Sequence, residues 1–400
     1  MSPLHRAHLQ DPRGTSIIGT ASASAATRVA RPGWRAALAF LGIAAVVFAA
    51  MAGLGVVGPG VNVIGRYQGP RWLRGWAQWD SGWYATIADH GYDYVPGRQS
   101  TAAFFPAYPM LVRAVSVVVG GAFVAGIVVT LASGAAAAAL FLRWAGERLS
   151  PRAAWASQLM LLLYPYAYYL YGAVYPTALF LAAAIGAFVL LDHGRPWLSG
   201  LTGAVATAAG PIGLALVVGL AVRAVERRQK EGDIRLARRD AGVLVSVLGL
   251  LGFCVYLWWR FGDPWIFASA QRAWGQGAGP RTWFKVRFFE DLPTLRYPFP
   301  AMAYLAHPLL TIAGFALLPR VFRRFGYGYG TYALLVIGLS CLGTKNFFGM
   351  ARYVMAAFPC FAVAGDLLAE RPRVAAATYT ISGAGLFALT LAFGRGYYLS

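Results

Sequence analysis

Long apolar segments recur along the chain, and short segments that contain basic residues separate them. A helix needs about 20 predominantly apolar residues to cross the hydrocarbon core of a bilayer. Backbone groups in lipid must be hydrogen-bonded internally, which a continuous apolar segment achieves as a helix. We therefore predict an all-α polytopic membrane protein with about 11 transmembrane helices, at residues 34–58, 121–142, 154–172, 175–192, 198–209, 211–224, 241–259, 301–318, 327–343, 353–370 and 374–393.

The amino-acid composition agrees with a surface that faces lipid. Only 12% of the 400 residues are charged and 58% are hydrophobic, whereas a soluble domain carries about 25% charged residues. A net charge of +20 would suggest a nucleic-acid partner in a soluble protein. Here the basic residues lie mostly between apolar segments, so we expect contacts with anionic membrane lipids and no nucleic-acid partner.

The distribution of basic residues predicts the orientation in the membrane. The segments assigned to the cytoplasm are the shorter ones, yet they hold 21 of the 35 Lys and Arg residues. Because basic loops stay on the cytoplasmic side, we predict a plasma-membrane protein with a cytoplasmic N-terminus and an external C-terminus. Residues 1–33 are predicted to form a disordered cytoplasmic tail, and residues 34–400 a single transmembrane domain.

Two parts of the chain depart from this regular pattern. The segments 198–209 and 211–224 are short for a span and meet at Gly210-Pro211, which breaks a helix. Such broken helices are tolerated where they line a polar cavity, so we expect a cavity there. The external loops 59–120 and 260–300 are unusually long, and loops of that length are usually functional. We predict that these two loops form a catalytic face.

The first external loop contains two predicted amphipathic helices. Residues 80–90 start at Asp80, a favoured N-cap residue type, and end before Gly91, a favoured residue type after a helix C-terminus. Residues 104–118 form the second helix, which Pro106 opens. Each helix has an apolar face, which we expect to lie on the membrane surface.

Aromatic side chains surround the acidic residue at the start of the first of these helices. Trp79 and Trp83 flank Asp80 in the sequence, and aromatic rings suit stacking on sugar rings. A carboxylate at this place can take a proton from a sugar hydroxyl, or it can serve as a helix N-cap. The residues alone leave these two interpretations open.

Further elements of this loop form one pattern with Asp80, namely Trp79-Asp80, Tyr84, Ile87-Ala88, Gly91-Tyr92 and Ala103-Phe104-Phe105-Pro106-Ala107-Tyr108-Pro109. The pattern resembles the signature of the PIG-V mannosyltransferases, which are polytopic enzymes of the GT-C class with bacterial members. Weaker elements extend the resemblance along much of the chain: Leu163-Tyr164-Pro165, Ala270-Gln271-Arg272-Ala273-Trp274 and Gly349-Met350-Ala351-Arg352-Tyr353.

The resemblance implies a GT-C-like fold and a reaction. A hexose, with mannose as the first choice, would pass from a polyprenyl-phosphate donor to a hydroxyl of a glycolipid or glycan acceptor. The anomeric carbon would be inverted, and Asp80 would be the general base. Two departures from the family pattern put the sugar, the acceptor or the activity in doubt. Pro176-Thr177 stands where many members have an acidic residue, and Ala208-Ala209 where many have an Arg.

The implied reaction needs a cation for the departing phosphate and side chains that orient the sugar. Arg352 leads the candidates for the cation because it is predicted at the external end of a span, and Arg272 and Lys345 follow. A divalent cation shared by the phosphate and Asp80 or Asp93 also stays open. The residues predicted to bind substrates are Trp79, Trp83, Tyr84, His90, Asp93, Gln271, Arg272, Trp274, Lys345, Arg352 and Tyr353.

Three other functions stay open at this point. A transporter or flippase of a lipid-linked sugar would suit the broken helix at Gly210-Pro211, although acidic residues are few inside the predicted spans, where a transporter needs charge. A GT-C enzyme for another sugar, such as arabinose or glucose, would fit the resemblance. So would a non-catalytic subunit that holds a partner enzyme.

Overall fold

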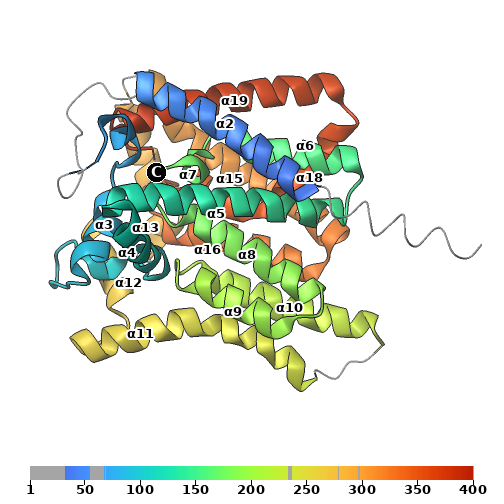
Figure 1. Cartoon of the computed structure of the whole chain (residues 1–400), viewed down its shortest axis with the longest axis horizontal. Coiled ribbons are helices and arrows are strands. Elements are labelled where there is room, and N and C mark those ends of the chain that lie inside the picture. The colour runs from blue at the N-terminus through green and yellow to red at the C-terminus, as the bar shows by residue number, and fades with distance from the viewer. Residues whose placement is uncertain are drawn as a thin grey trace, which may run out of the picture.

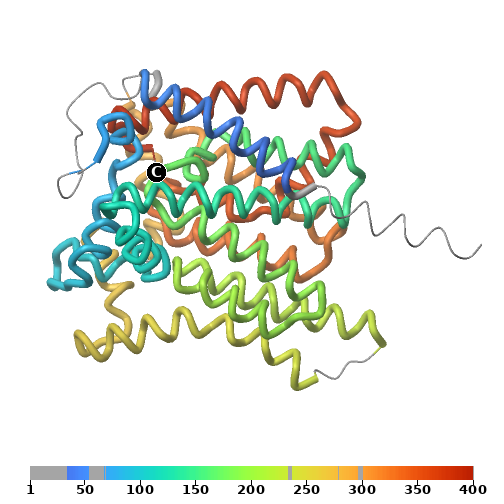
Figure 2. Tube along the Cα trace, in the orientation of Figure 1, coloured from blue at the N-terminus to red at the C-terminus, as the bar shows by residue number. Residues whose placement is uncertain are grey.

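The computed structural model describes residues 32–54, 67, 69–232, 237–277, 279–295 and 298–399. Residues 1–31 of the predicted tail lie outside these ranges. The described residues form helices and no strand, as predicted. The helices of the bundle run side by side in Figure 1 and can be followed as a continuous trace in Figure 2. They are α2 (Pro32–Leu54), α5 (Ala122–Gly146), α6 (Pro151–Leu162), α8 (Thr177–Asp192), α9 (Pro196–Thr207), α10 (Gly213–Lys230), η3 (Arg238–Val247), α11 (Leu248–Phe261), α15 (Pro298–Phe325), α16 (Tyr327–Gly343), α17 (Met350–Ala356), α18 (Phe358–Ala369) and α19 (Pro372–Gly394).

Short helices from both long loops gather at one end of the bundle, on the left of Figure 1. The C-terminal end of the described chain lies toward this end, whereas α2 begins at the opposite end. The two long loops that were predicted to share one side of the membrane therefore do share one end of the bundle. Their short helices are η1 (Arg71–Trp76), α3 (Ser81–His90), η2 (Thr101–Ala103), α4 (Ala107–Val119), α12 (Ile266–Ala270), η4 (Gln271–Trp274), α13 (Pro280–Trp283), α14 (Val286–Asp291) and η5 (Leu292–Thr294).

Five helices of the described chain are long and apolar enough to cross a membrane. A sixth is counted if α17 and α18, which are bent by 80° at their junction, form one broken span. The shorter apolar helices α4, α8 and α16 have 13, 16 and 17 residues. Each of the eleven predicted spans contains helix, although residues 55–58 of the first lie outside the described ranges and the predicted span 154–172 is broken between Leu162 and Tyr168. The number of crossings stays a prediction. The long spans are Trp34–Gly53, Ala122–Gly146, Arg238–Phe261, Ala301–Phe325 and Pro372–Gly394.

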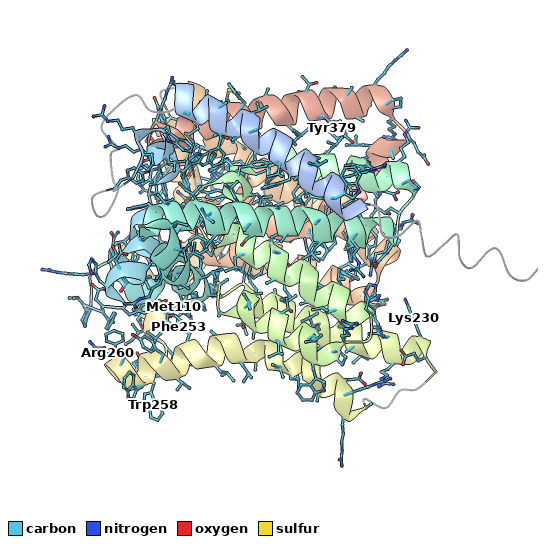
Figure 3. All side chains as sticks on the ribbon, viewed as in Figure 1. Met110, Lys230, Phe253, Trp258, Arg260 and Tyr379 are labelled. Carbon is cyan, nitrogen blue, oxygen red and sulfur yellow. The ribbon has the colours of Figure 1, made fainter. Side chains whose placement is uncertain are left out.

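The surface of α11 fits a helix in a lipid bilayer. Trp258 and Trp259 expose 63% and 79% of their surface. Figure 3 labels Trp258 and Arg260 at the end of α11 near the short helices, and Lys230 at the opposite end of the molecule. Tryptophan and basic side chains are typical of the two membrane–water interfaces. The apolar length between these ends agrees with one crossing of the bilayer.

The centre of the bundle is α5, which packs against α2, α4, α6 and α8. Its Gly- and Ala-rich sequence allows neighbouring backbones to approach closely, as small residues do between membrane helices. A side chain at Gly134 would collide with the Leu170 carbonyl oxygen and the Phe40 ring. A side chain at Gly126 would overlap Val174. These contacts bring the 164–175 segment against α5.

The break at Gly210-Pro211 lies between α9 and α10, as predicted. The cavity expected at the break stays a prediction. Beside the break the helices approach closely: a side chain at Gly213 would overlap Thr207, and one at Gly249 would collide with the Ala204 carbonyl oxygen. The break also anchors the first loop, since the Ala107 N–H donates to the Ala208 carbonyl oxygen at 2.8 Å.

A network of charged residues joins α8, α10, α16 and the turn after α5 at the end of the bundle opposite the short helices. The Asp192 carboxylate at the end of α8 accepts from Arg223 Nε at 2.8 Å and from the Tyr329 hydroxyl at 2.8 Å. It also pairs with Arg148. The Asp192 side chain is only 9% exposed. The arginines compensate the charge of the nearly buried carboxylate, and they also pair with Glu147 and Glu226.

We predict that Asp192→Ala destabilises the protein strongly. Loss of one partner of a buried ion pair costs about 3–5 kcal/mol, because the remaining charge is left unpaired. The matched control is Asp366→Ala, which removes a 3.7 Å pair with Arg324 between side chains that are 37% and 52% exposed. Such an exposed pair is worth about 0–1 kcal/mol. Thermal unfolding in nanodiscs measures both, and equal shifts in Tm would contradict the account.

Candidate active site at the end of the bundle with the short helices

Asp80 lies between η1 and α3, at the N-cap position of α3, but its side chain makes no capping hydrogen bond. Its backbone is in the right-handed helical region, with φ −63° and ψ −12°, whereas an N-cap residue normally has extended dihedral angles. Its own N–H donates to the Tyr175 hydroxyl at 3.1 Å. The sequence left two interpretations of the Asp80 side chain open. The structure therefore excludes the one in which this side chain caps the helix.

The residue before Asp80 is held in an unusual backbone conformation. Trp79 has φ +55°, which is uncommon for a bulky residue and costs free energy. Two contacts stabilise it: Nε1 donates to the Tyr397 carbonyl oxygen at 3.0 Å, and the indole packs on the Tyr398 ring with centroids 4.6 Å apart. The C-terminal segment thus helps to set the direction of the Asp80 side chain.

The Asp80 carboxylate is half-buried and has no hydrogen-bond or ion-pair partner among the described residues. Burial raises its pKa above the ordinary value, and the positive charge of Arg352 partly opposes that rise. Desolvation disfavours the charged form, whereas a nearby cation favours it. A carboxylate that is more basic than usual and free of partners is chemically suited to accept a proton.

Arg352, on α17, lies against a cluster of tyrosine rings. Its guanidinium carbon is 5.3 Å from the Tyr169 ring centroid, 5.2 Å from that of Tyr175 and 5.2 Å from that of Tyr353. Cation–π contacts of this kind stabilise a partly desolvated cation. Among the described residues Arg352 makes no ion pair with a carboxylate, so its charge is available to an anionic ligand.

The tyrosines connect the two charged residues. The Tyr84 ring contacts that of Tyr175 at 6.0 Å, and the Tyr169 ring contacts Tyr175 at 4.9 Å. Tyr84 and Tyr175 are buried. Burial, and then the nearby Asp80 carboxylate, raises the pKa of Tyr84 well above its ordinary value, so its hydroxyl stays neutral.

The C-terminal segment after α19 lies across this cluster. Tyr398 packs between Trp79 and Phe348, whose ring is stacked on it at 5.2 Å. His307 fixes the next residue: the Ala351 N–H donates to His307 Nδ1 at 3.3 Å, so Nε2 carries the proton and donates to the Leu399 carbonyl oxygen at 3.1 Å. Burial and the Asp80 charge raise the pKa of Tyr398, so it remains a neutral donor beside Asp80.

Several other predicted residues meet where the two long loops touch. The Trp83 ring stacks on Phe104 at 5.6 Å and meets the edge of Trp274 at 5.6 Å. Gln271 Nε2 donates to the Ala103 carbonyl oxygen at 3.3 Å. Lys345 Nζ donates to the Trp274 carbonyl oxygen at 3.2 Å. These residues therefore join the loops, and Lys345 is already engaged by the backbone.

Three predicted site residues lie apart from the charged pair. His90 is exposed at the C-terminal end of α3, and Arg272 is exposed with its guanidinium on Ser269 at 3.1 Å. Asp93 accepts from the Thr101 N–H at 2.9 Å and from its hydroxyl, so it fixes the loop. The apolar face of α3 was expected on the membrane surface, but the structure buries it in protein.

Sequence reasoning assigned no role to four side chains of the site. Tyr169 and Tyr175 follow shortly after the Leu163-Tyr164-Pro165 element of the family pattern, which was the one available signal. His307 and Tyr398 gave no signal, because their importance depends on how the C-terminal segment folds back on α15 and α17. Among the described residues, no group of three or more His, Cys, Asp or Glu side chains gathers to hold a metal ion.

No family model and no curated protein matches this chain. Solved structures of the oligosaccharyltransferase from Archaeoglobus fulgidus do. The apo form aligns with a TM-score of 0.50 at 13% identity, over 92% of this chain and 57% of that one. The complex with zinc and sulfate has a TM-score of 0.48 at 13% identity over 90% and 53%. The complex with an inhibitory peptide and a dolichol-phosphate has 0.47 at 13% identity over 91% and 56%.

The chain therefore spans little more than half the length of the solved structures that it resembles. A likeness at this level of identity concerns the fold. The fold is that of a polytopic membrane protein of the GT-C type.

Proposed function

We propose that this protein is a membrane glycosyltransferase that moves a hexose, with mannose as the first choice, from a polyprenyl-phosphate donor to a hydroxyl of a glycolipid or glycan acceptor. The observation that carries the proposal is the pair of opposite charges at the site. The Asp80 carboxylate and the Arg352 guanidinium interact electrostatically, yet neither has an ion-pair partner in the described part of the chain. Both groups are left available for substrates.

The proposed reaction is a single displacement. Asp80 takes the proton of the acceptor hydroxyl as its oxygen forms a bond to the anomeric carbon. The bond from that carbon to the phosphate oxygen breaks, and its electron pair leaves with the phosphate. Arg352 stabilises the growing negative charge on the phosphate in a poorly hydrated site. Attack opposite the leaving group inverts the anomeric carbon.

The charges near Asp80 bear on whether a metal ion takes part in the proposed reaction. Asp80 has no second carboxylate in a group of metal-ligating side chains within the described ranges, and the neighbouring charge is the Arg352 cation. A divalent cation would be repelled by that guanidinium. We therefore assign the neutralisation of the phosphate to Arg352 and derive no step through a metal ion.

The proposed location of the reaction is the outer side of the plasma membrane. The site lies at the end of the bundle with the short helices, opposite the end where α2 begins. The basic segments that we assign to the cytoplasm lie around 143–152, 193–197 and 223–239. The positive-inside bias supports this orientation.

One observation supports a sugar other than mannose as the second candidate. Tyr175 contacts both Asp80 and Arg352, and the departure from the family pattern at Pro176-Thr177 follows it directly. The residue types next to the reacting groups therefore differ from those of many PIG-V-like enzymes. Arabinose and glucose donors belong in the same assay.

We predict that Asp80→Asn abolishes sugar transfer, by about 10²–10⁴-fold, because the amide cannot take the proton. Asp89→Asn is the matched control, since Asp89 is an exposed carboxylate on the same helix. The assay uses purified protein in nanodiscs, radiolabelled polyprenyl-phosphate mannose and extracted host lipids. Asp80→Asn should not lower Tm, because burial disfavours the ionised form that it removes. Equal transfer by both variants would remove Asp80 as the base, and transport of the donor without transfer would favour a flippase.

We predict that Arg352→Gln lowers kcat by about 10²–10³-fold, the usual effect of losing one group that stabilises charge in the transition state. Arg352→Lys should retain part of the activity, because it keeps the charge but loses the planar contact with the tyrosines. Arg272→Gln, an exposed control, should behave as wild type. If Arg272→Gln lowered kcat as much as Arg352→Gln does, the assignment of the phosphate to Arg352 would be wrong.

The pH profile tests the electrostatic link between the two residues. Because the Asp80 pKa is raised and the base must be ionised, kcat/KM should fall on the acid side at a higher pH than an ordinary aspartate predicts. Arg352 lowers this pKa, so Arg352→Gln should move the acid limb to still higher pH, and Arg352→Lys should move it less. An acid limb that does not move in Arg352→Gln would show that another group controls it.

A further inference from the structure

A cavity of about 250 Å³ lies next to the charged pair, on the other side of Tyr398. It is enclosed by the start of α15, the η5 segment after α14 and the C-terminal segment. Tyr398 is half-exposed and Thr294 is exposed, so the cavity reaches the surface. Its lining includes Asp291, Thr294, Ala303, Tyr304, His307 and Tyr398.

The polar groups of the cavity converge on one carboxylate. Asp291 Oδ2 accepts from the Tyr304 hydroxyl at 3.1 Å and from Asn346 Nδ2 at 3.3 Å, and Oδ1 pairs with Arg287 Nε at 2.9 Å. Asn346 is 7% exposed and is not among the residues that line the cavity. Together with Arg287 it holds the Asp291 carboxylate in place at the cavity wall.

The size and chemistry of the cavity restrict its ligand. Pockets for drug-sized ligands measure roughly 300–1,000 Å³, so this smaller cavity suits a single ring and not a lipid chain or an oligosaccharide. The Tyr304 and Tyr398 side chains line the cavity and offer apolar surface to the C–H groups of a sugar. The Asp291 carboxylate accepts hydrogen bonds from hydroxyls, and the Tyr304 hydroxyl lies beside it. A negative carboxylate disfavours the phosphate of the donor.

We propose that this cavity binds the terminal pyranose ring of the acceptor. Tyr398 lines the cavity and also lies beside Asp80, so a ring held here can present one hydroxyl past Tyr398 to the base. His307 holds the Leu399 carbonyl and thereby the wall that Tyr398 forms. The assignment rests on the proposed transfer reaction, and it names the acceptor as a glycan that ends in a hydroxylated ring.

Direct binding tests the cavity without the reaction. The probe is methyl α-D-mannopyranoside, and saturation-transfer NMR detects its contact with the full chain in nanodiscs. Wild type and Asp80→Asn should both bind it. Asp291→Asn should bind the mannoside at least about tenfold more weakly, because the substitution removes the charge that strengthens the hydrogen bonds to the sugar hydroxyls. Glu290→Gln is the matched control, since Glu290 neighbours Asp291, also pairs with Arg287, and does not line the cavity.

A second pair of variants tests the space itself. Ala303 lines the cavity and is 8% exposed, whereas Met302 on the same helix is 70% exposed. Ala303→Trp should fill the cavity and abolish binding of the mannoside, and Met302→Trp should bind as wild type. Far-UV circular dichroism and Tm show that each variant is folded. Asp291→Asn keeps the shape of the side chain, so it decides the question if Ala303→Trp does not fold.

Transfer kinetics identify the source of the ring. Asp291→Asn should raise KM for the acceptor and leave KM for the polyprenyl-phosphate donor unchanged. A raised KM for the donor alone would assign the cavity to the donor sugar and overturn the proposal. If wild type transferred sugar but did not bind the mannoside, the cavity would not be the acceptor site, although the proposed enzyme activity would stand. Mannoside binding that none of the variants changes would lead to the same conclusion. Binding that follows the prediction without transfer from any donor would support a sugar site and overturn the proposed enzyme.

Discussion

The candidate site depends on holding two opposite charges near each other without letting them pair. Asp80 and Arg352 come from the first external loop and from α17, and their charges interact within the protein. An ion pair would neutralise both groups and leave neither for a substrate. The tyrosine rings stabilise the guanidinium through their faces. Tyr84 and Tyr398 lie near the carboxylate and stay neutral.

The rest of the fold supplies the parts of this arrangement from distant places in the sequence. The small residues of α5 let the 164–175 segment pack closely, which places Tyr169 and Tyr175 at the site. The C-terminal segment is held through Trp79 and His307. The unfavourable backbone angle at Trp79 is thus offset by a hydrogen bond to the carbonyl oxygen of Tyr397, which lies 318 positions later in the sequence. Strain of this kind concentrates at functional sites.

Local sequence patterns predicted those features that depend on apolar length and on loop composition. The helices, the break at Gly210-Pro211, the helix that follows Asp80 and the meeting of the two long loops are all present. The number of crossings could not be derived, because a helix such as α8 is apolar on all sides whether protein or lipid surrounds it. For the same reason the apolar face of α3 was assigned to the membrane surface, although protein covers it.

The finer composition of the site could be predicted only in part. Arg352 and Tyr353 were named from a short element near the end of a span, and they do lie at the site. His90 and Asp93 share the loop of Asp80, but one points into solvent and the other binds Thr101. Tyr398 reads in the sequence as one more aromatic residue at a membrane interface. Only tertiary structure brings it to Asp80.

The most direct test of the central claim is a cryo-EM structure of the chain in nanodiscs with a non-cleavable phosphonate analogue of polyprenyl-phosphate mannose. The account predicts that the phosphonate oxygens lie within hydrogen-bond distance, about 2.7–3.2 Å, of the Arg352 guanidinium. It also predicts that the face of the anomeric carbon opposite the phosphonate is turned toward Asp80. A phosphonate bound elsewhere, or an anomeric carbon that Asp80 cannot approach from that face, would contradict the account.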